Sequence, residues 1–501
     1  MVYNEFSDMK RLPLIAVVLV LLLSSCDSSG GTSWVWPDEK DGNFWAVNTK
    51  NNRYYRVDAE MLVEGTYCEI WAEKGSGVDY VTALNIASKF DSKIYNTLID
   101  IFGVSEEITI DDKKKTLNTM EIADSLGNND GKLCILLLDI KDDYRKGVND
   151  SYVAGYFRLI DFFENSPGSS FLYSNERDMI YIDINPGNPE SEDFFSTIAH
   201  ETQHLMNFVT SCLYRVDGNM IYTMDLWIDE GLSSAAEREY SGKHPENRWA
   251  WFNDDKSGLI QSGNNFFVWD NHGNNNYAIL DDYSTVYLFF QWLRLQAAPK
   301  NIYSEIIKSP YPFYDYQAVT KAADKIMGGN GYDSWETLLK TWLAVNYINA
   351  PTGKFGYRGD DDLKDIKVKT MPAKTTSVSL APGEGVYSST KSGYSMPVQG
   401  NNIKYAGLDK NSPWLSDTQT FTNANGILLT FNANTNTNGK AETGKTTGVA
   451  STAIVPPGRV SAIPLSGPFP KGAGNLPGMN EYKEISGFGL SIPPLVTISR
   501  E

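Results

Sequence analysis

The stretch "STIAHETQHLMNF", residues 196–208, constrains the fold of this 501-residue chain more than any other. It holds two of only four histidines in the sequence, His200 and His204, four positions apart. In an α-helix, side chains at this spacing project from the same face, one turn apart, which is the reach that two imidazoles need to hold one zinc ion. Apolar residues surround the pair on both sides, so the sequence predicts a buried helix that carries a metal site.

Glu201 lies between the two histidines and is rotated onward by one residue. From that position its carboxylate does not readily bind the same ion, but it can reach a water bound to that ion. Zinc lowers the pKa of such a water to about 7. Glu201 can then take a proton from the water as it attacks a carbonyl, and deliver the proton to the leaving amine. The H-E-x-x-H pattern therefore predicts zinc-dependent hydrolysis with Glu201 as the catalytic base.

A catalytic zinc ion usually has three protein ligands and one open position, so a third ligand is needed. The two remaining histidines are poor candidates, because His244 follows a Gly-Lys turn and His272 lies in an asparagine-rich loop. A carboxylate on the following helix is better placed, because the connection after the first helix is long enough for the chain to return beside it. Within the segment "DLWIDEGLSSAAEREY", the candidates are Asp229, Glu230, Glu237 and Glu239.

Two motifs together resemble the gluzincin metallopeptidases. The H-E-x-x-H stretch is followed by Trp227-Ile228-Asp229-Glu230-Gly231-Leu232-Ser233, which matches the pattern W-x-x-E-G-x-[SA] residue for residue. In the aminopeptidase N group, the glutamate of this pattern is the third zinc ligand. The resemblance therefore implies that His200, His204 and Glu230 bind zinc and that Glu201 is the general base.

The hyicolysin-type secreted bacterial metallopeptidases resemble the chain more closely. They share the long gap between the two motifs and a W-x-x-E-G-[LF]-[SA] second element, and the similarity covers roughly residues 60–350. The aminopeptidases have a shorter gap and a G-x-M-E-N strand before the helix, for which this sequence has no counterpart. The resemblance implies an α+β, zincin-like metallopeptidase domain and endopeptidase action, with aminopeptidase action as an alternative.

The oxyanion that forms during peptide hydrolysis needs a hydrogen-bond donor besides zinc. In gluzincins a tyrosine or histidine on a later helix often supplies it. The segment "DDYSTVYLFFQWL" resembles the start of the helix that carries the aminopeptidase tyrosine. This resemblance implies that Tyr283 is the catalytic donor, with Tyr287 as the second choice. Glu237 lies about two turns along from Glu230, and we expect it either to support a ligand histidine or to be a solvated charge.

The N-terminus has the pattern of a secretory signal. Two basic residues precede an apolar run, Leu12–Leu23, which is too short to span a bilayer comfortably. The Leu-Ser-Ser-Cys sequence that ends at Cys26 resembles a bacterial lipobox, in which the cysteine is lipid-modified and becomes the first residue. We therefore expect a lipoprotein signal peptide over 1–26, a flexible tether over 27–45, and anchoring in the bacterial cell envelope, at the outer membrane or cell surface. An uncleaved membrane anchor is the alternative.

The rest of the chain mixes strands and helices. Apolar runs predict strands, at 61–73, 132–140 and 178–184. Helical spacing predicts helices, at 81–102, 225–240, 282–297 and 334–349. The apolar stripe of the first of these consists of Val81, Leu84, Ala87, Ile94, Leu98 and Ile101, and Gly103 is expected to end it. The helix with the two histidines is expected to begin with Asn188 as N-cap and Pro189 as its first residue.

Composition divides the chain near residue 355. Residues 46–355 carry both motifs and form the predicted zinc metallopeptidase domain, in which a mixed sheet precedes a helical active-site subdomain. Residues 356–375 are predicted to be a linker. Residues 376–501 contain short β-prone runs broken by Gly, Pro, Asn and Thr, such as "GILLTFNANTNTNG" and "STAIVPPG". They predict a β-rich, sandwich-type C-terminal domain.

The net charge of −18, without a block of basic residues, argues against nucleic acid as a partner, because phosphate binding needs a concentrated positive surface. We therefore expect a protein or peptide substrate, and contact with a membrane through a lipid on Cys26. The leading hypothesis is a zinc-dependent endopeptidase tethered to the cell envelope. The alternatives are an aminopeptidase and a non-catalytic surface lipoprotein that binds a host or envelope ligand.

Overall fold

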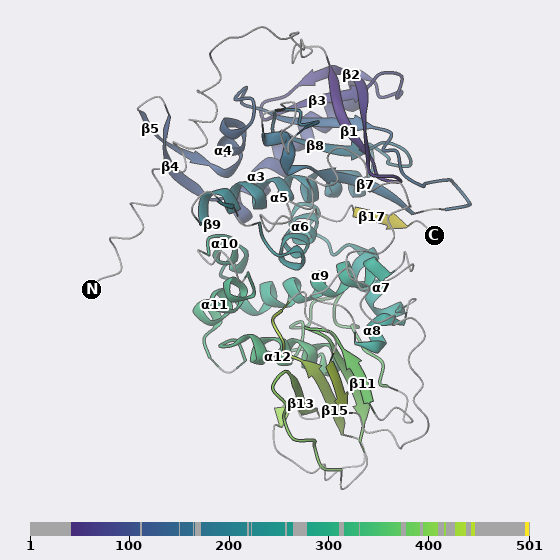
Figure 1. Ribbon diagram of the computed structural model, residues 1–501, viewed down its shortest axis with the longest axis vertical. Coiled ribbons are helices and arrows are strands. Elements are labelled where there is room, and N and C mark those ends of the chain that lie inside the picture. The colour runs from purple at the N-terminus through teal and green to yellow at the C-terminus, as the bar shows by residue number, and fades with distance from the viewer. Residues whose placement is uncertain are drawn as a thin grey trace.

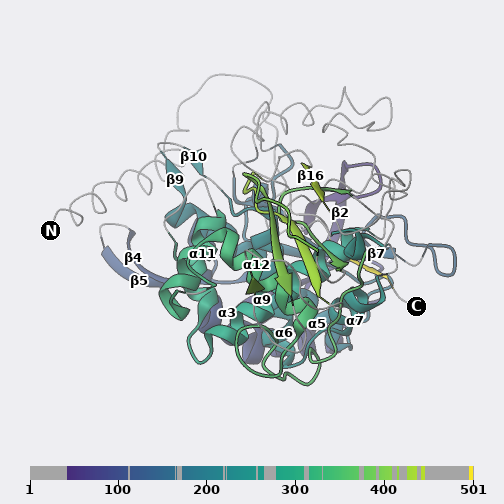
Figure 2. The same cartoon turned by 90° about the horizontal axis from the view of Figure 1, so that it is seen from below.

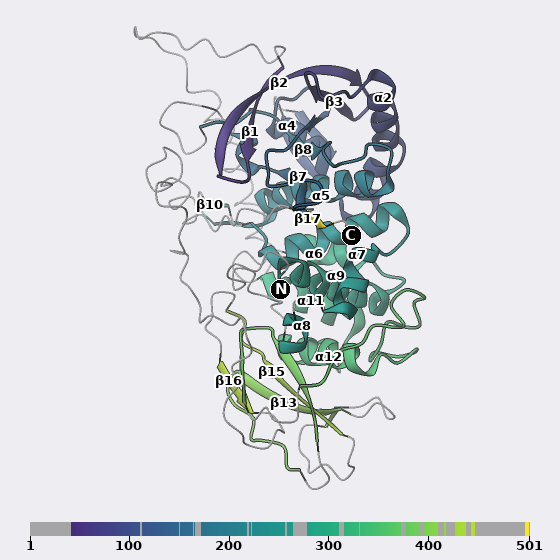
Figure 3. The ribbon, with the colours of Figure 1, turned by 90° about the vertical axis from the view of Figure 1, so that its right-hand side faces the viewer.

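The fold is described from a computed structural model of the chain. The structure describes residues 42–445 and 496–499, with gaps at 111–112, 150, 164, 166–171, 218–219, 222, 256–257, 264–277, 310–314, 330, 372–376, 391–393, 409–414, 417–425 and 437–441. Three regions follow one another along the long axis: a seven-stranded sheet, a group of helices and a smaller β region (Figures 1 and 3). The molecule is thus mixed α and β, as an α+β metallopeptidase is expected to be.

The seven-stranded sheet has the strand order β1-β2-β3-β6-β8-β7-β17. Its strands are β1 (Asn43–Asn48), β2 (Arg53–Glu64), β3 (Cys68–Glu73), β6 (Leu133–Leu138), β8 (Met179–Asp183), β7 (Ser151–Phe157) and β17 (Val496–Ser499). β3, β6 and β8 are parallel, and the other neighbouring pairs are antiparallel. All six residues of β6 are buried, which explains why the predicted strand at 132–140 is apolar throughout.

The segment 61–73, predicted as one strand, is instead the junction of the β2–β3 hairpin. In the turn, the backbone N–H groups of Thr66 and Tyr67 donate to the carboxylate of Asp91 at 2.6 and 2.9 Å. Gly65 precedes these residues and is the turn signal in this stretch. The sequence pattern did not reveal this turn, because the apolar residues on both sides of Gly65 are as compatible with two short strands as with one long strand.

Three helical segments follow β3: α2 (Tyr80–Lys89), the π-helix η2 (Phe90–Ile94) and α3 (Tyr95–Phe102). α2 packs on β2 and β3 of the sheet, and α3 packs on α5 (Glu192–Tyr214) and α6 (Leu226–Ser241). The three segments end at Gly103, as predicted. The predicted apolar stripe is wrong in its first turn, because Val81 and Leu84 are 70% and 46% exposed while Ala83 and Ile86 are fully buried. The π-helical turn changes the helical phase, so one stripe cannot be extrapolated across it.

Shorter elements lie in several parts of the fold. They are β4 (Ser105–Ile110), β5 (Lys113–Asn118), α4 (Thr119–Leu126), the 3-10 helix η3 (Leu159–Phe162), β9 (Val216–Asp217), β10 (Met220–Ile221), α8 (Leu259–Ser262), α10 (Ile302–Ile307) and α11 (Asp315–Met327). α4 packs on α5 and β5, α10 on α3 and α11, and α8 on α9 (Ala278–Ala297) and β12 (Gly385–Ser389). The side chain of Asn118 caps α4 by accepting from the backbone N–H groups of Met120 and Glu121.

The helix predicted from the two histidines is α5 (Glu192–Tyr214), which packs on β7 and β8. It begins later than predicted. Ser191 is its N-cap and accepts from the backbone N–H of Phe194 at 3.2 Å. Asn188 instead caps a preceding turn by accepting from the backbone N–H of Glu190 at 3.1 Å. The sequence offers an N-cap residue at both positions, and the serine lies directly before the first helical turn.

Four further helices form the middle region: α6 (Leu226–Ser241), α7 (Glu246–Asp254), α9 (Ala278–Ala297) and α12 (Trp335–Ile348). α6 packs on α5, and α9 packs on both α6 and α7. α12 follows on the far side of α9, where the rings of Phe289 and Trp342 meet at 5.4 Å. The predicted helices at 225–240, 282–297 and 334–349 are therefore observed, and they form successive layers away from the sheet (Figure 3).

The smaller β region lies against α12 (Figure 2). Its four-stranded sheet has the order β12 (Gly385–Ser389), β15 (Ile427–Asn432), β13 (Ile403–Leu408) and β14 (Leu415–Ser416). β11 (Ser377–Leu380) and β16 (Glu442–Lys445) pair separately. The hydroxyl of Tyr387 donates to the backbone oxygen of Leu343 in α12 at 2.7 Å. This region therefore shares a hydrophobic core with the helices.

Residues 356–375, predicted as a linker, are packed against the helices over much of their length. Tyr357 and Leu363 are fully buried, and Ile366 is nearly so. The hydroxyl of Tyr357 donates to the side chain of Asn346 in α12 at 2.6 Å. The many charged residues between these anchors produced the linker-like composition, but the anchors fix the segment to the fold.

The two ends of the chain depart from the predicted boundaries. β1 begins at Asn43, so the last residues of the predicted tether 27–45 belong to the sheet. β17 pairs with β7, so the predicted C-terminal domain returns to the first sheet near its end. The predicted signal peptide, Cys26, His272 and the run "STAIVPPG" lie outside the described residues. No helix within the described ranges combines the length and apolar character that a membrane crossing requires.

Candidate metal centre

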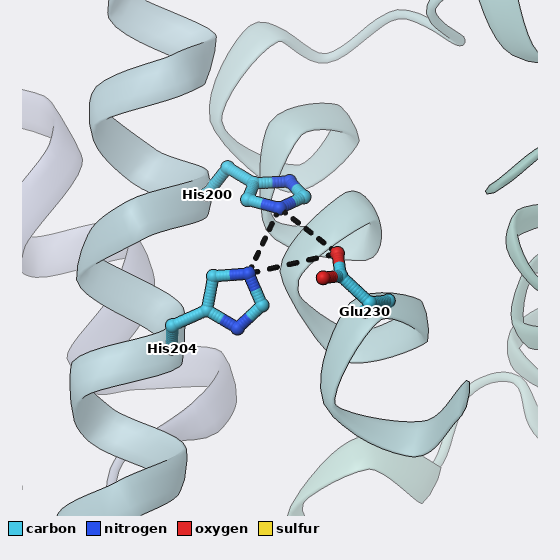
Figure 4. Close-up of side chains that lie close together, drawn as sticks. All are labelled: His200, His204 and Glu230. Carbon is cyan, nitrogen blue, oxygen red and sulfur yellow. Dashed lines mark hydrogen bonds and ion pairs between the residues drawn. The ribbon is translucent and has the colours of Figure 1, made fainter. Parts of the chain in front are cut away.

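Two neighbouring helices bring His200, His204 and Glu230 together. The histidines project from α5 and the glutamate from α6, and all three side chains are buried (Figure 4). The Nε2 atoms of the two histidines lie 3.1 Å apart. Glu230 Oε2 lies 3.3 Å from His200 Nε2 and 3.6 Å from His204 Nε2. The structure thus places the three predicted ligands around one point.

This triangle has the size that zinc requires. Tetrahedral coordination with bonds of about 2.0–2.1 Å places the donor atoms about 3.3–3.4 Å apart. The three observed separations of 3.1, 3.3 and 3.6 Å bracket that value. Two imidazole nitrogens and one carboxylate oxygen are also a donor set that catalytic zinc sites use. The residues present therefore fit a zinc ion, with one position left open.

The far nitrogen of each imidazole is held by a carboxylate. His200 Nδ1 lies 2.7 Å from Glu237 Oε1, and His204 Nδ1 lies 3.0 Å from Asp229 Oδ2. A carboxylate accepts a hydrogen bond, so these contacts place the ring proton on Nδ1 and direct the Nε2 lone pair into the triangle. Of the two roles expected for Glu237, the structure favours the first, because Glu237 contacts His200, a candidate ligand, and is 7% exposed.

The electrostatics of the cluster favour positive charge. Burial alone would lower the pKa of His200, but Glu230 and Glu237 raise it above its ordinary value. Burial likewise opposes charge on His204, while Asp229 and Glu230 raise its pKa well above the ordinary value. Burial would raise the pKa of Glu230, yet the two histidines lower it to about 2. The carboxylates thus stabilise a cation among the ring nitrogens, and a bound metal ion would supply that charge.

Glu201 lies on the same helix and faces the sheet beside the cluster. Its carboxylate is 1% exposed, and burial raises its pKa to about 7 despite the opposing effect of the two histidines. A Cβ on Gly155 of β7 would lie only 2.9 Å from Glu201 Cγ. The backbone of β7 therefore passes directly against this side chain, and only glycine fits there. Glu201 Oε1 has no hydrogen-bond partner among the described residues, which leaves it able to accept a proton.

The two candidate tyrosines occupy different surroundings. Tyr283 is fully buried, and its ring centroid lies 6.5 Å from that of His200. Burial and the nearby carboxylate of Glu230 raise its pKa well above the ordinary value, so its hydroxyl stays protonated and can donate. Tyr287 is one turn along α9, and its hydroxyl lies 2.5 Å from His244 Nδ1. The structure therefore brings Tyr283, the first choice, to the cluster and engages Tyr287 elsewhere.

The W-x-x-E-G motif has a packing explanation. Trp227 is fully buried, and its ring lies 6.0 Å from Phe289 and 5.6 Å from Trp335. A Cβ on Gly231 would lie 2.4 Å from the ring of Phe290 in α9. The tryptophan anchors α6 and the glycine lets α9 approach, four residues apart on one helix face. Glu230, one residue before the glycine, is thereby held toward α5.

Sequence reasoning missed several groups around the ligands. Ser233 Oγ lies 3.1 Å from His204 Nδ1, beside Asp229. Asn207 donates from Nδ2 to Asp229 Oδ1 at 2.6 Å and ties the carboxylate back to α5. A serine and an asparagine are too common to stand out, although Asn207 lies one residue short of a full turn after His204. Of the four candidate carboxylates, Glu239 is turned away and pairs with Arg238 at 3.1 Å.

Comparison with known proteins points to the same class. The chain is similar to the neutral metalloprotease ShpI of Staphylococcus hyicus, with 28% identity over 369 residues that cover 71% of this chain and 73% of ShpI. No protein-family model matches the chain. The similarity and the buried His-His-Glu cluster support a metallopeptidase family, protease activity and a zinc-type metal.

Proposed function

We propose that this protein is a zinc-dependent endopeptidase, with His200, His204 and Glu230 as the zinc ligands and Glu201 as the general base. One observation carries the proposal. Three buried acceptor atoms from two helices converge at 3.1–3.6 Å, while carboxylates hold the far nitrogen of each imidazole. A cation bound between these atoms would stabilise the arrangement, because acceptors repel one another at such distances. The similarity to a neutral metalloprotease supports the same assignment.

A zinc ion held by these residues would polarise a peptide carbonyl and lower the pKa of a water to about 7. Glu201 accepts the proton of the attacking water and returns it to the leaving nitrogen. A pKa near 7 suits both transfers, because the group must gain and lose a proton at neutral pH. The hydroxyl of Tyr283 donates a hydrogen bond to the oxyanion that develops on the carbonyl oxygen.

The substrate class follows from what flanks the cluster. The sequence has no counterpart of the motif that binds a free α-amine in aminopeptidases, which favours internal bonds. An endopeptidase cleaves N-terminally blocked peptides and casein, whereas an aminopeptidase requires a free amine. Equal cleavage of blocked and free-amine peptides supports the endopeptidase, and strict dependence on the free amine supports the aminopeptidase.

The decisive experiment compares three full-length proteins extracted in detergent: the parent, Glu201→Gln and Glu239→Gln. Glutamine keeps the shape of Glu201 but cannot accept the proton, so we expect zinc content near that of the parent and casein hydrolysis lower by about 10²–10⁴-fold. Glu239→Gln is the matched control, because this carboxylate pairs with Arg238 away from the cluster. Undiminished hydrolysis by Glu201→Gln would refute the assigned base. Absence of zinc from the parent protein would refute the proposed cofactor.

We also propose that the protein is anchored in the cell envelope through a lipid on Cys26. The lipobox-like residues before Cys26 support this proposal. Cys26→Ala should move the protein from the membrane fraction to the soluble fraction after cell disruption, because the lipid supplies the membrane affinity. Continued sedimentation of the variant with membranes would favour the uncleaved apolar segment as the anchor.

A further inference from the structure

Arg248, in α7, carries a buried positive charge beside the candidate metal centre. Its side chain is 2% exposed. Its Nη2 donates to Glu237 Oε1 at 2.9 Å, and the same oxygen lies 2.7 Å from His200 Nδ1. A buried guanidinium is costly unless it is paired, so this contact holds both side chains in place. The carboxylate that supports His200 is therefore itself fixed by a second helix.

The same guanidinium also lies over the ring of Tyr283. The distance from its central carbon to the ring centroid is 4.7 Å, within the range of a cation–π contact. α7 packs directly on α9, which carries this tyrosine. Arg248 thus contacts one side chain that supports a ligand histidine and another that faces the ligands.

We propose that Arg248 is a positioning residue that holds Glu237 against His200 and the Tyr283 ring toward the metal centre. The first contact acts on metal binding. The contact with Tyr283 acts on the transition state, and this part of the proposal rests on the proposed function.

The two contacts can be separated, because they use different properties of arginine. The ion pair with Glu237 needs a positive charge, which lysine keeps. The contact with Tyr283 uses a flat, delocalised guanidinium, which lysine lacks. Arg248→Lys should therefore preserve metal binding and impair catalysis, whereas Arg248→Met should impair both. A purely structural arginine would affect only the melting temperature.

The test measures zinc affinity by chelator competition, kcat and KM for a blocked peptide, and the melting temperature, all on the full-length protein. We expect Arg248→Met to weaken zinc binding about 10–100-fold, and Arg248→Lys to stay within about threefold of the parent. We expect Arg248→Lys to lower kcat about tenfold with KM within about twofold. The loss in kcat should largely disappear when Arg248→Lys is combined with Tyr283→Phe and compared with Tyr283→Phe alone.

Arg158→Lys and Arg158→Met are the matched controls. Arg158 is also buried, pairs with Asp161 at 3.7 Å and lies 5.1 Å from the ring centroid of Tyr54, in the part of the fold around β1 and β8. These changes should lower the melting temperature and leave zinc affinity and kcat unchanged. The proposal is wrong if Arg248→Met binds zinc as tightly as the parent, or if the loss in kcat is the same with and without the Tyr283 hydroxyl. A parent protein that binds zinc but cleaves no peptide refutes the proposed function, and the zinc affinities still decide the Glu237 contact.

Discussion

Within the described part of the chain, two groups of histidine and carboxylate side chains have their ligand atoms close together. One is His200, His204 and Glu230, all buried. The other is His244, Asp360 and Asp362, of which Asp362 is exposed. By proximity alone, both could hold a metal ion. They differ in where the nitrogen lone pairs point, and that difference separates a candidate metal centre from a structural contact.

In the first group, Nδ1 of each imidazole contacts a carboxylate, and the two Nε2 atoms lie close to each other and to Glu230. In the second group both nitrogens of one imidazole are already used. His244 Nδ1 lies 2.5 Å from the hydroxyl of Tyr287, and His244 Nε2 lies 3.1 Å from Asp360 Oδ2. Asp360 Oδ1 is also occupied, by the backbone N–H groups of residues 362 and 363. We therefore interpret this second group as a tie between the α6–α7 turn, α9 and the segment after α12.

The largest expected difference between the two groups is in histidine replacement. His204→Ala should weaken zinc binding on the order of 10³-fold, because it removes one of the three proposed ligands. His244→Ala should leave zinc affinity within about twofold of the parent. Chelator competition on the two full-length variants measures both values. Loss of zinc from the His244 variant would show that the second group, and not the first alone, contributes to metal binding.

Replacement of the acidic member should give a smaller effect. Glu230→Gln keeps a ligand oxygen but removes a negative charge, and we expect zinc affinity to fall about 10²-fold. Asp362→Asn in the other group is the control, with no expected change. Zinc content after dialysis against a weak chelator distinguishes them. Full retention by Glu230→Gln would point to another third ligand.

The groups behind the imidazoles should matter less than the ligands. Asp229→Asn weakens the acceptor that fixes the His204 ring, so zinc affinity should fall about 10-fold and at most about 100-fold. Asp360→Asn makes the corresponding change behind His244 and should leave zinc affinity unchanged. If the two variants bind zinc equally well, the support of His204 by Asp229 has no role in metal binding.

The smallest effect is expected in stability. Burial would raise the pKa of Asp360, but its contact with His244 lowers it below the ordinary value. This contribution is therefore present above the unfolded pKa of about 3.9 and is lost as the pH falls through the lower folded value. Asp360→Asn should cost about 1 kcal/mol or less in the free energy of unfolding at pH 7. Urea denaturation of both proteins at pH 7 measures it, and a difference above about 3 kcal/mol would contradict a simple tie.

The sequence patterns whose predicted local structure is observed have a common physical basis. The spacing of His200 and His204 fixes one face of a helix whatever surrounds it, and the all-apolar run of β6 requires burial on both faces. The motif at 227–233 contains the residues that fix its packing, because Trp227 anchors α6 and Gly231 lets α9 approach. For these features the sequence alone was sufficient to predict the local structure and to bring His200, His204 and Glu230 together as candidate ligands.

Features that depend on distant parts of the chain could not be predicted in this way. Arg248 is one of many basic residues in the sequence, and nothing local indicates that α7 brings it to Glu237. Gly155 is one of 41 glycines, and its importance comes from the closeness of β7 to Glu201, Thr197 and the backbone of Tyr181. Residues 356–375 have the composition of a linker, yet Tyr357 and Leu363 find partners on helices formed earlier in the chain.

β17 has a practical consequence for protein engineering. Its Val496 pairs with Gly155, the residue whose backbone runs against Glu201. An affinity tag fused directly after β17 would therefore lie at the edge of the sheet on which α5 packs. Deleting the last six residues would remove this strand and bare the outer hydrogen-bonding groups of β7. Purification handles and truncations at this end are therefore not neutral choices for assays of the enzyme.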